Sequence, residues 1–375
     1  MRTSVAEAFG LEFPIFAFSH CRDVVAAVSR AGGMGVLGAL AFTPEQLEVE
    51  CRWIDEHVGG RPYGVDVVMP AAYAGADLPA GDGLEDALQA MVPDEHRRFV
   101  EEILERHGVP ALADDAPRPR TLLGWTHGEA RSHVDVALSH PIALLANALG
   151  PPPPDVVELA HRHGVKVAAL VGSASQARKQ VEVGVDVVVA QGNEAGGHTG
   201  EISTLVLVPE VVDAVSPTPV LAAGGIGCGR QLAAALALGA QGAWTGSIWL
   251  TVSEADTPPF IRDKLLRATS RDTVRSRALT GKPARQLRTA WTEAWDDPKG
   301  PGALPMPLQF MLTAEAQHRI GRAENEDLAG MPVGQIVGRM NSVRATRDVI
   351  FDMVDEALRT IAQLSETAAA AVPGA

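Results

Sequence analysis

Eight short apolar segments alternate with helical patterns along the first 250 residues, and this alternation constrains the fold more strongly than any other feature. The segments that predict strands are residues 13–18, 35–37, 63–69, 142–146, 166–170, 186–190, 219–223 and 242–246. Short buried strands that alternate with helices are typical of parallel β/α units. Eight such units are the number that closes a TIM barrel. The pattern therefore predicts an α/β fold built on a TIM (β/α)8 barrel.

Two regions interrupt this alternation. Residues 70–125 are rich in Gly, Pro and Asp, and we interpret them as an inserted excursion that contains one charged helix. Residues 253–330 combine helical patterns with loops, which predicts an additional, smaller and mostly helical lid domain. A strongly periodic segment at 349–364 is expected to return to the outer layer of the barrel. The predicted domains are a barrel of residues 1–252 plus 331–368 and a lid of residues 253–330.

An open α/β sheet is the main alternative to the barrel. Such a sheet would carry a glycine-rich dinucleotide turn near the start of the chain, directly after a strand. The glycine-rich stretch Gly32-Gly33-Met34-Gly35 precedes a strand instead. The position of these glycines therefore favours the barrel.

The composition excludes several classes of function. The chain of 375 residues is 46% hydrophobic and carries a formal charge of −14, which disfavours nucleic acid and anionic membranes as partners. Three widely spaced cysteines without a CxxC pair favour neither a disulfide framework nor a zinc site, so no metal is expected. We see neither the apolar core of a signal peptide nor a run of about 18 apolar residues. We expect a cytoplasmic enzyme for a small-molecule substrate, and we leave a homodimer open.

A glycine-rich stretch, Gln191 to Gly200, follows the sixth predicted strand and precedes a helical pattern at Pro209–Ser216. Glycines allow a backbone to approach a ligand closely. The same stretch carries Glu194 and His198, and a histidine can exchange a proton near neutral pH. A loop of this kind at the carboxyl end of a barrel strand predicts part of an active site.

Two further glycine turns follow the seventh and eighth predicted strands. Gly224 and Gly225 end the seventh strand, and Gly246 and Ser247 end the eighth. Backbone N–H groups in such turns can hold a phosphate without Lys or Arg. The alternative is that these glycines serve tight turn geometry alone. Taken together, the two turns favour a phosphate site.

These segments resemble the nitronate monooxygenase family, formerly called 2-nitropropane dioxygenases. The resemblance rests on Ala190-Gln191-Gly192-x-Glu194-Ala195-Gly196-Gly197-His198-x-Gly200, on Ala222-Ala223-Gly224-Gly225-Ile226 and on Thr245-Gly246-Ser247. Gly64-Val65-Asp66-Val67, Ser173 and Gly281-Lys282-Pro283-Ala284-Arg285 follow in the expected order, so the likeness covers most of residues 10–290. Flavin-dependent enoyl-ACP reductases share the same signature.

The resemblance implies an FMN-bound barrel in which His198 acts as a base toward an acidic carbon or positions the substrate. It implies cofactor contacts from Ala17, Phe18, Asp66, Ser173, Gln191, Gly192, Gly196, Gly197, Ala223, Gly224, Gly225, Gly246 and Ser247. For Ser173, helix capping is an equal alternative. Glu194 is a substrate candidate, although hydrogen bonding within its own loop is the simpler role.

Some residues depart from the family pattern. The family usually has an Ala-Pro-Met-like turn after the first strand, whereas this chain has Ala17-Phe18-Ser19-His20-Cys21. His20 is therefore a second substrate candidate, with a role at the start of a helix as the alternative, and Cys21 is interpreted as a packing thiol. Asp66 replaces the usual Asn, and a carboxylate there would disfavour an anionic reduced flavin.

Three functions remain compatible with these residues. The first is oxidation of a carbon acid with O2, with FMN as cofactor and His198 as base. The second is an NAD(P)H-dependent FMN reductase that acts on an enoyl thioester or a quinone. The third is a flavin-binding protein without turnover. The basic stretch Arg262–Arg288 is interpreted as a solvated face, with a site for an anionic substrate tail as the alternative.

Overall fold

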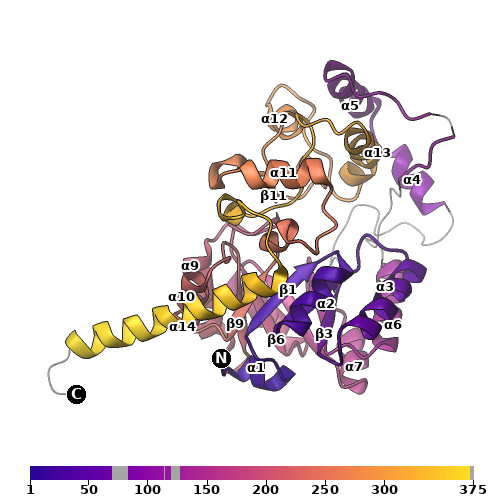
Figure 1. Cartoon of the computed structure of the whole chain (residues 1–375). Coiled ribbons are helices and arrows are strands. Elements are labelled where there is room, and N and C mark those ends of the chain that lie inside the picture. The colour runs from indigo at the N-terminus through magenta and orange to yellow at the C-terminus, as the bar shows by residue number, and fades with distance from the viewer. Residues whose placement is uncertain (70–82, 114, 120–126, 372–375) are drawn as a thin grey trace.

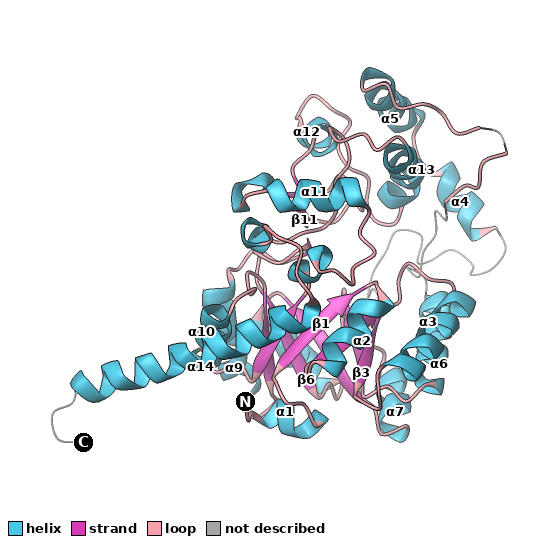
Figure 2. Ribbon diagram, in the orientation of Figure 1, coloured by secondary structure: helices cyan, strands magenta, loops and turns pink. Residues whose placement is uncertain are grey.

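The computed structural model describes residues 1–69, 83–113, 115–119 and 127–371, and its centre is a closed barrel of parallel strands. The strand order is β1-β2-β3-β4-β5-β6-β8-β9, and β1 closes the barrel against β9 (Figures 1 and 2). The predicted TIM barrel is therefore confirmed. The eight strands are Ile15–Ser19, Met34–Gly38, Tyr63–Val68, Leu144–Ala148, Lys166–Val171, Val187–Gln191, Val220–Ala223 and Gly242–Thr245.

Side chains alternate between the inside and the outside of the barrel, as the period of a strand requires. The interior is filled by a cluster to which seven of the eight strands contribute and which includes Phe16, Met34, Leu144, Val189 and Trp244. The intervening residues pack outward against the helices. This alternation decides which side chains reach the inner rim at the carboxyl ends of the strands.

Helices surround the barrel, and the last one closes its outer layer. They are α1 Ser4–Phe9, α2 Arg22–Arg30, α3 Pro44–His57, α6 His127–Ser139, α7 Pro154–Arg162, α8 Ala174–Glu182, α9 Thr204–Val215, α10 Gly229–Ala237 and α14 Thr346–Ala371. α14 packs against α10 and α2, as predicted for the periodic C-terminal segment. Its far end extends away from the barrel (Figure 1). Among the described helices, none is long and apolar enough to cross a membrane.

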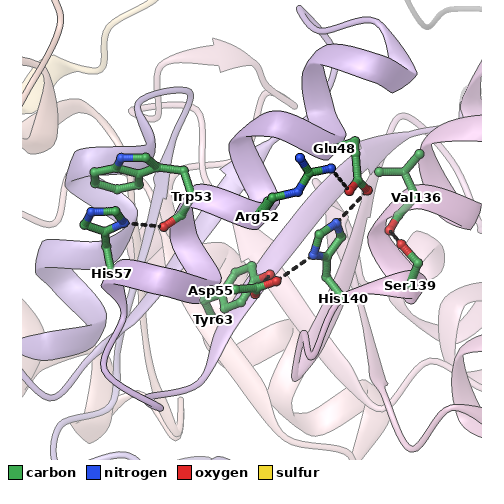
Figure 3. A network of polar contacts seen from close by, with 9 residues as sticks. All are labelled: Glu48, Arg52, Trp53, Asp55, His57, Tyr63, Val136, Ser139 and His140. Carbon is green, nitrogen blue, oxygen red and sulfur yellow. Dashed lines mark hydrogen bonds and ion pairs between the residues drawn. The ribbon is translucent and has the colours of Figure 1, made fainter.

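A polar network ties α3 and the loop after α6 to the outside of β3 (Figure 3). The His140 ring lies between two carboxylates, with Nδ1 2.6 Å from Asp55 and Nε2 2.9 Å from Glu48. The Tyr63 hydroxyl donates to the second oxygen of Asp55 at 2.7 Å. The network lies on the outer, helix-covered side of the strand, so its role is to fix helices to the barrel.

A second layer lies over the carboxyl ends of the strands (Figure 1). Its elements from the C-terminal part are η1 Ser247–Thr251, α11 Pro259–Arg267, η2 Ser270–Asp272, β10 Thr273–Ser276, β11 Ala284–Leu287, α12 Ala290–Asp296, α13 Leu308–Arg322 and η3 Gln335–Arg339. The short strand β7, Gly197–His198, pairs with β11 and completes a three-stranded antiparallel sheet in the order β10-β11-β7. A sheet was not predicted in this region.

The described part of the excursion joins this upper layer. Its helices α4, Leu84–Ala90, and α5, Asp94–Arg106, pack against α13. Arg319 of α13 donates to Glu101 at 2.8 Å and to the carbonyl oxygen of Pro110 at 3.0 Å. The rest of the predicted excursion, residues 70–82, 114 and 120–125, lies outside the described residues. The predicted domain boundaries stay a prediction.

One helix begins earlier than predicted. The pattern at Pro209–Ser216 indicated a helix with proline at its start, but α9 begins at Thr204 and contains Pro209 in its interior. The start is set by Glu194, whose carboxylate accepts hydrogen bonds from the Thr204 N–H at 3.0 and 3.2 Å. A carboxylate at a helix N-terminus also interacts favourably with the helix dipole.

Candidate active site

The loop after β6 is built around the side chain of Glu194. Its carboxylate accepts from the N–H of Thr204 and from the Thr204 hydroxyl, the latter at 2.8 Å. The same hydroxyl lies 3.2 Å from the carbonyl oxygen of Ala223 and 3.1 Å from that of Gly224. Thr204 therefore joins the loop after β6 to the glycine turn after β8. The contacts of Glu194 are those of the simpler predicted role, within its own loop.

His198 lies on β7, where strand pairing places it beside β11. Ala284 is its register partner, and its Nε2 atom lies 2.8 Å from the Thr280 hydroxyl oxygen. The side chain of His198 is half-buried. Burial lowers the pKa of His198 to about 4, and the positive charge of Lys282 lowers it further. The imidazole is therefore neutral at pH 7 and able to accept a proton.

The glycine turns at 224–225 and 246–247 have the geometry of an anion site. Among the described residues, the backbone N–H groups of Gly225, Ile226, Gly246 and Ser247 donate no hydrogen bond. Gly225 has φ of +68°, and the space where a side chain of Gly246 would begin is open. Unpaired N–H groups in such turns are the donors that a phosphate dianion needs. The predicted cofactor contacts at these positions are thus compatible with the structure.

The inner rim of the barrel carries the residues predicted to face the flavin ring. Phe18, Asp66, Gln191 and Ala223 follow interior positions of their strands, so their side chains point inward. Ala17 points outward into the core between barrel and helices, so only its backbone faces the rim. Sequence reasoning placed all five residues at the same end of the barrel, and the structure brings them there.

His20 follows β1 and lies against the end of β2. Its Nδ1 atom lies 2.9 Å from the carbonyl oxygen of Gly38, and its ring meets that of Phe18 edge to face with centroids 5.1 Å apart. A carbonyl oxygen only accepts, so Nδ1 carries the proton and Nε2 is an acceptor in the neutral ring. The side chain is exposed, yet desolvation by surrounding protein lowers its pKa. A side chain that is accessible to solvent and still desolvated has protein on several sides.

Asp66 is the most perturbed carboxyl of the inner rim. It is 4% exposed, and among the described residues none donates a hydrogen bond or forms an ion pair with its carboxyl. Burial alone raises the pKa of Asp66 to about 7. A substantial fraction of Asp66 is therefore protonated at neutral pH, and a protonated carboxyl can donate a hydrogen bond that an Asn amide would otherwise supply.

The remaining predicted residues have clear local positions. Ser173 caps α8, with its hydroxyl accepting from the Gln176 N–H at 3.3 Å. Gly192 donates to the carbonyl oxygen of Ala223 at 2.9 Å. A side chain at Gly196 would meet the backbone of Val333 and Gly334. The Cys21 thiol is buried against the carbonyl oxygen of Glu254, at 3.3 Å, which agrees with its interpretation as a packing thiol.

Two contacts of the site escaped sequence reasoning. Thr280 binds His198 across 82 residues of chain, and Arg285 donates through Nε to the carbonyl oxygen of Asn193 at 2.7 Å. Both partners belong to the β10–β11 segment, whose pairing with β7 is not visible in a local pattern. The motif Gly281-Lys282-Pro283-Ala284-Arg285 was the available signal, but it carried no indication of these contacts. In the described part of the chain, no group of three or more His, Cys, Asp or Glu side chains could hold a metal ion.

Known proteins similar to this chain agree with the geometry. The sequence model of the nitronate monooxygenase family matches residues 6–356. A Mycobacterium tuberculosis protein named as a monooxygenase is 58% identical over 376 residues, which cover 97% of this chain and 98% of that protein. The solved structure of nitroalkane oxidase from Streptomyces ansochromogenes has a TM-score of 0.79 at 25% identity and covers 96% of this chain and 99% of its own. FabK from Thermotoga maritima has a TM-score of 0.71 at 26% identity, with 98% and 99% covered.

Proposed function

Because the chain belongs to the nitronate monooxygenase family, and is thus a flavin-dependent oxidoreductase, we propose that it oxidises a carbon acid with O2, with FMN as cofactor and His198 as base. The observation that carries the proposal is the position of His198. It lies on a short strand directly after the loop that Thr204 joins to the phosphate-compatible turn at Gly224 and Gly225.

The protein's own groups account for binding and proton transfer. The N–H groups of Gly225 and Ser247 would hold the FMN phosphate, while Phe18 and Asp66 face the ring from the inner rim. Bound FMN supplies the electron and oxygen chemistry, and the protein supplies orientation. Neutral His198 takes the proton from carbon, and the hydrogen bond between Nε2 and Thr280 fixes the ring.

The test is anaerobic mixing of the FMN-loaded enzyme with an alkyl nitronate. Rapid loss of the oxidised flavin absorbance is expected, followed by its return when O2 is admitted. A set of nitronates of different chain length that leaves the spectrum unchanged would contradict the proposal. His198→Ala serves as the matched variant. It should keep FMN bound and lose the bleaching by the parent nitroalkane, from which a proton must be taken, but keep the bleaching by the nitronate, which is already deprotonated.

The similarity to FabK favours a second candidate, reduction of an enoyl thioester or a quinone by NAD(P)H. The same anaerobic experiment separates the two. Fast flavin reduction by NADH or NADPH supports the second candidate, whereas reduction by nitronate alone supports the first. A flavin-binding protein without turnover would respond to neither.

A further inference from the structure

Positive charge gathers in one segment of an otherwise acidic chain. Residues 271–288 contain six Lys and Arg residues and a single acid, Asp272, although the whole chain carries a formal charge of −14. This segment forms β10, β11 and the turn between them, and β11 pairs with β7. The basic stretch is therefore adjacent to His198 in space, which the sequence could not show.

Lys282 is the cation of this segment whose charge acts on His198 and whose backbone bonds the same threonine hydroxyl. Its backbone N–H donates to the Thr280 hydroxyl oxygen at 3.3 Å, and the same oxygen lies 2.8 Å from Nε2 of His198. Its charge lowers the pKa of His198 directly. A single threonine hydroxyl thus links the backbone of Lys282 to the imidazole of the predicted base.

The turn that carries Lys282 is held rigidly. Gly281 has φ of +82°, and a side chain at this position would overlap the Leu304 carbonyl oxygen. The Gly281 N–H donates to the carbonyl oxygen of Arg277 at 2.9 Å, and Pro283 restricts the next step of the backbone. A rigid turn presents the Lys282 side chain without the cost of ordering the backbone on binding.

The Lys282 ammonium group has no counterion within the described part of the chain. Among the described residues, none forms an ion pair with its ammonium group, and no carboxylate raises its pKa. The residue is half-buried, and desolvation lowers its pKa. A partly desolvated cation without a partner is costly for the free protein, and an anionic ligand removes that cost.

We propose that Lys282 is the anion-binding residue of this site and holds the negative charge of an ionised substrate beside His198. The proposal rests on the proposed function and names its substrate class, an organic anion. The charge is either that of the reacting group itself, as in the nitronate that the carbon acid becomes when His198 takes its proton, or that of a carboxylate elsewhere on the substrate. Both use the same ion pair with the Lys282 ammonium group.

The neighbouring arginines do not share this position. Arg275 and Arg285 are register partners on β10 and β11, and Arg285 is also paired with Gly197. His198 is paired with Ala284, one residue further along, so its side chain lies on the opposite face of the sheet from both arginines. Arg285 is in addition engaged with the carbonyl oxygen of Asn193. Lys282 is therefore the cation whose removal tests the proposal.

The first experiment measures binding without turnover. Nitrate, a planar anion of nitronate shape, is titrated into the FMN-loaded enzyme and followed by calorimetry. Lys282→Met is expected to weaken nitrate binding at least tenfold, and Lys282→Arg to restore it to within about threefold, because a charge-assisted contact needs the cation. Arg288→Gln, which removes an exposed cation of the same segment, should leave the Kd within twofold. Unchanged nitrate affinity in Lys282→Met would overturn the proposal.

A second measurement is independent of ligands. The pKa of His198, followed by its ring proton resonances, should rise in Lys282→Met and stay unchanged in Arg288→Gln. If it does not rise in Lys282→Met, Lys282 does not face His198 and the proposal is wrong. If the parent enzyme oxidises no nitronate but nitrate binding still requires Lys282, the proposed reaction fails while the anion site stands.

Turnover then identifies the source of the charge. The kcat/KM of Lys282→Met is compared for a simple alkyl nitronate and for a nitronate that carries a carboxylate. An equal loss for both places the reacting group on Lys282. A loss confined to the carboxylate-bearing compound places the distant carboxylate there. Equal kcat/KM for variant and parent with both compounds would overturn the proposal.

Discussion

Two sectors of the barrel rim each present a histidine, and they hold it in different ways. His198 belongs to a strand that spans the two layers, because β7 follows a barrel strand and pairs with β11 of the upper layer. His20 is held by a hydrogen bond to the carbonyl oxygen of Gly38 at the end of β2, a strand of the barrel. Desolvation by the surrounding protein lowers the pKa of both residues. Both are therefore neutral at pH 7, and position rather than protonation distinguishes them.

The sector of His198 is built from both layers, and we call it the jointed sector. The sector of His20 is built from barrel strands, and we call it the barrel-held sector. The geometry of His198 depends on the docking of the upper layer, since Thr280 and Ala284 both belong to it. The positions of His20, Gly38 and Asp66 follow the register of β1, β2 and β3. We infer that movement of the upper layer would alter the base but not the floor of the site. The following predictions test this division.

The largest effect is expected when the two histidines are exchanged for glutamine one at a time. His198→Gln should lower kcat/KM for a neutral carbon acid by about 10²- to 10⁴-fold, the range for loss of a general base. His20→Gln should lower it less than about tenfold, because the base remains. Steady-state kinetics with equal FMN occupancy in both variants measures the ratio.

The pH profile gives the control for this comparison. With a pKa of about 4, His198 loses its basic form only as the pH falls toward 4, so kcat/KM should stay level from pH 8 down to about 5. If kcat/KM of the parent enzyme already falls as the pH is lowered through 6.5, the base is a group other than His198. Equal losses in both glutamine variants would remove the distinction between the sectors.

Asp66 gives the next largest effect, on stability rather than rate. Its pKa is about 7 in the folded protein against 3.8 in the unfolded chain, so the folded state binds more protons between these values. The free energy of unfolding therefore falls as the pH rises from 4 to 7, by up to about 4 kcal/mol from this group. Asp66→Asn should lack this loss and gain stability relative to the parent between pH 5 and pH 8.

Denaturant unfolding of Asp66→Asn and the parent at pH 5 and pH 8, with and without FMN, measures the difference in their unfolding free energies. His140→Gln is a suitable comparison, because it alters a polar network on the outer side of β3 rather than on the rim (Figure 3). If the unfolding free energies of Asp66→Asn and the parent differ by the same amount at every pH from 5 to 8, Asp66 is ionised throughout this range. That result would contradict its raised pKa.

The barrel was predictable because its signals are local. A barrel strand is buried on both faces and reads as an apolar run, so the prediction at 142–146 differs from Leu144–Ala148 by two residues. The strands of the upper sheet carry Arg275 and Arg285 and are four residues long, so nothing in their composition indicates a strand. In addition, the third strand of this sheet is β7, which has two residues and lies about 90 residues before β11 in the sequence.

The positions of the candidate site segments in the fold were predictable to a similar degree. The motif around His198 and the two glycine turns lie where the sequence placed them, at the carboxyl ends of neighbouring strands. The environment of each side chain was not predictable, because it depends on distant residues. Thr280 orients His198, and Glu194 moves the start of α9 five residues ahead of Pro209. A rule based on the position of proline cannot account for Glu194, which lies ten residues before the start of α9 at Thr204.

Gly38→Ala should disturb the barrel-held sector selectively. A methyl group at this position would lie 2.7 Å from Cε1 and Nδ1 of His20 and 2.8 Å from the ring of Phe18. Displacement of both rings should cost about 1–3 kcal/mol, as overpacking of a dense region does. Thermal unfolding measures the loss, and the bleaching rate with nitronate should change little. A large loss of bleaching with unchanged stability would place His20 in the reaction itself.

Glu194→Gln should have the smallest effect, and it tests the jointed sector. The amide oxygen can still accept from the Thr204 N–H, so the loop keeps its shape, while the negative charge at the N-terminus of α9 is lost. We expect a loss of about 0.5–1 kcal/mol in unfolding free energy, from the helix dipole alone. FMN affinity should change less than threefold, because the carboxylate faces Thr204 rather than the open N–H groups of the turn.

Thr204→Val is the matched variant, since it removes the hydroxyl that bridges to Ala223 and Gly224 and should weaken FMN binding more than Glu194→Gln does. If Glu194→Gln abolishes turnover while FMN stays bound, Glu194 contacts the substrate, and the base at His198 acts together with a second charged group from the same loop.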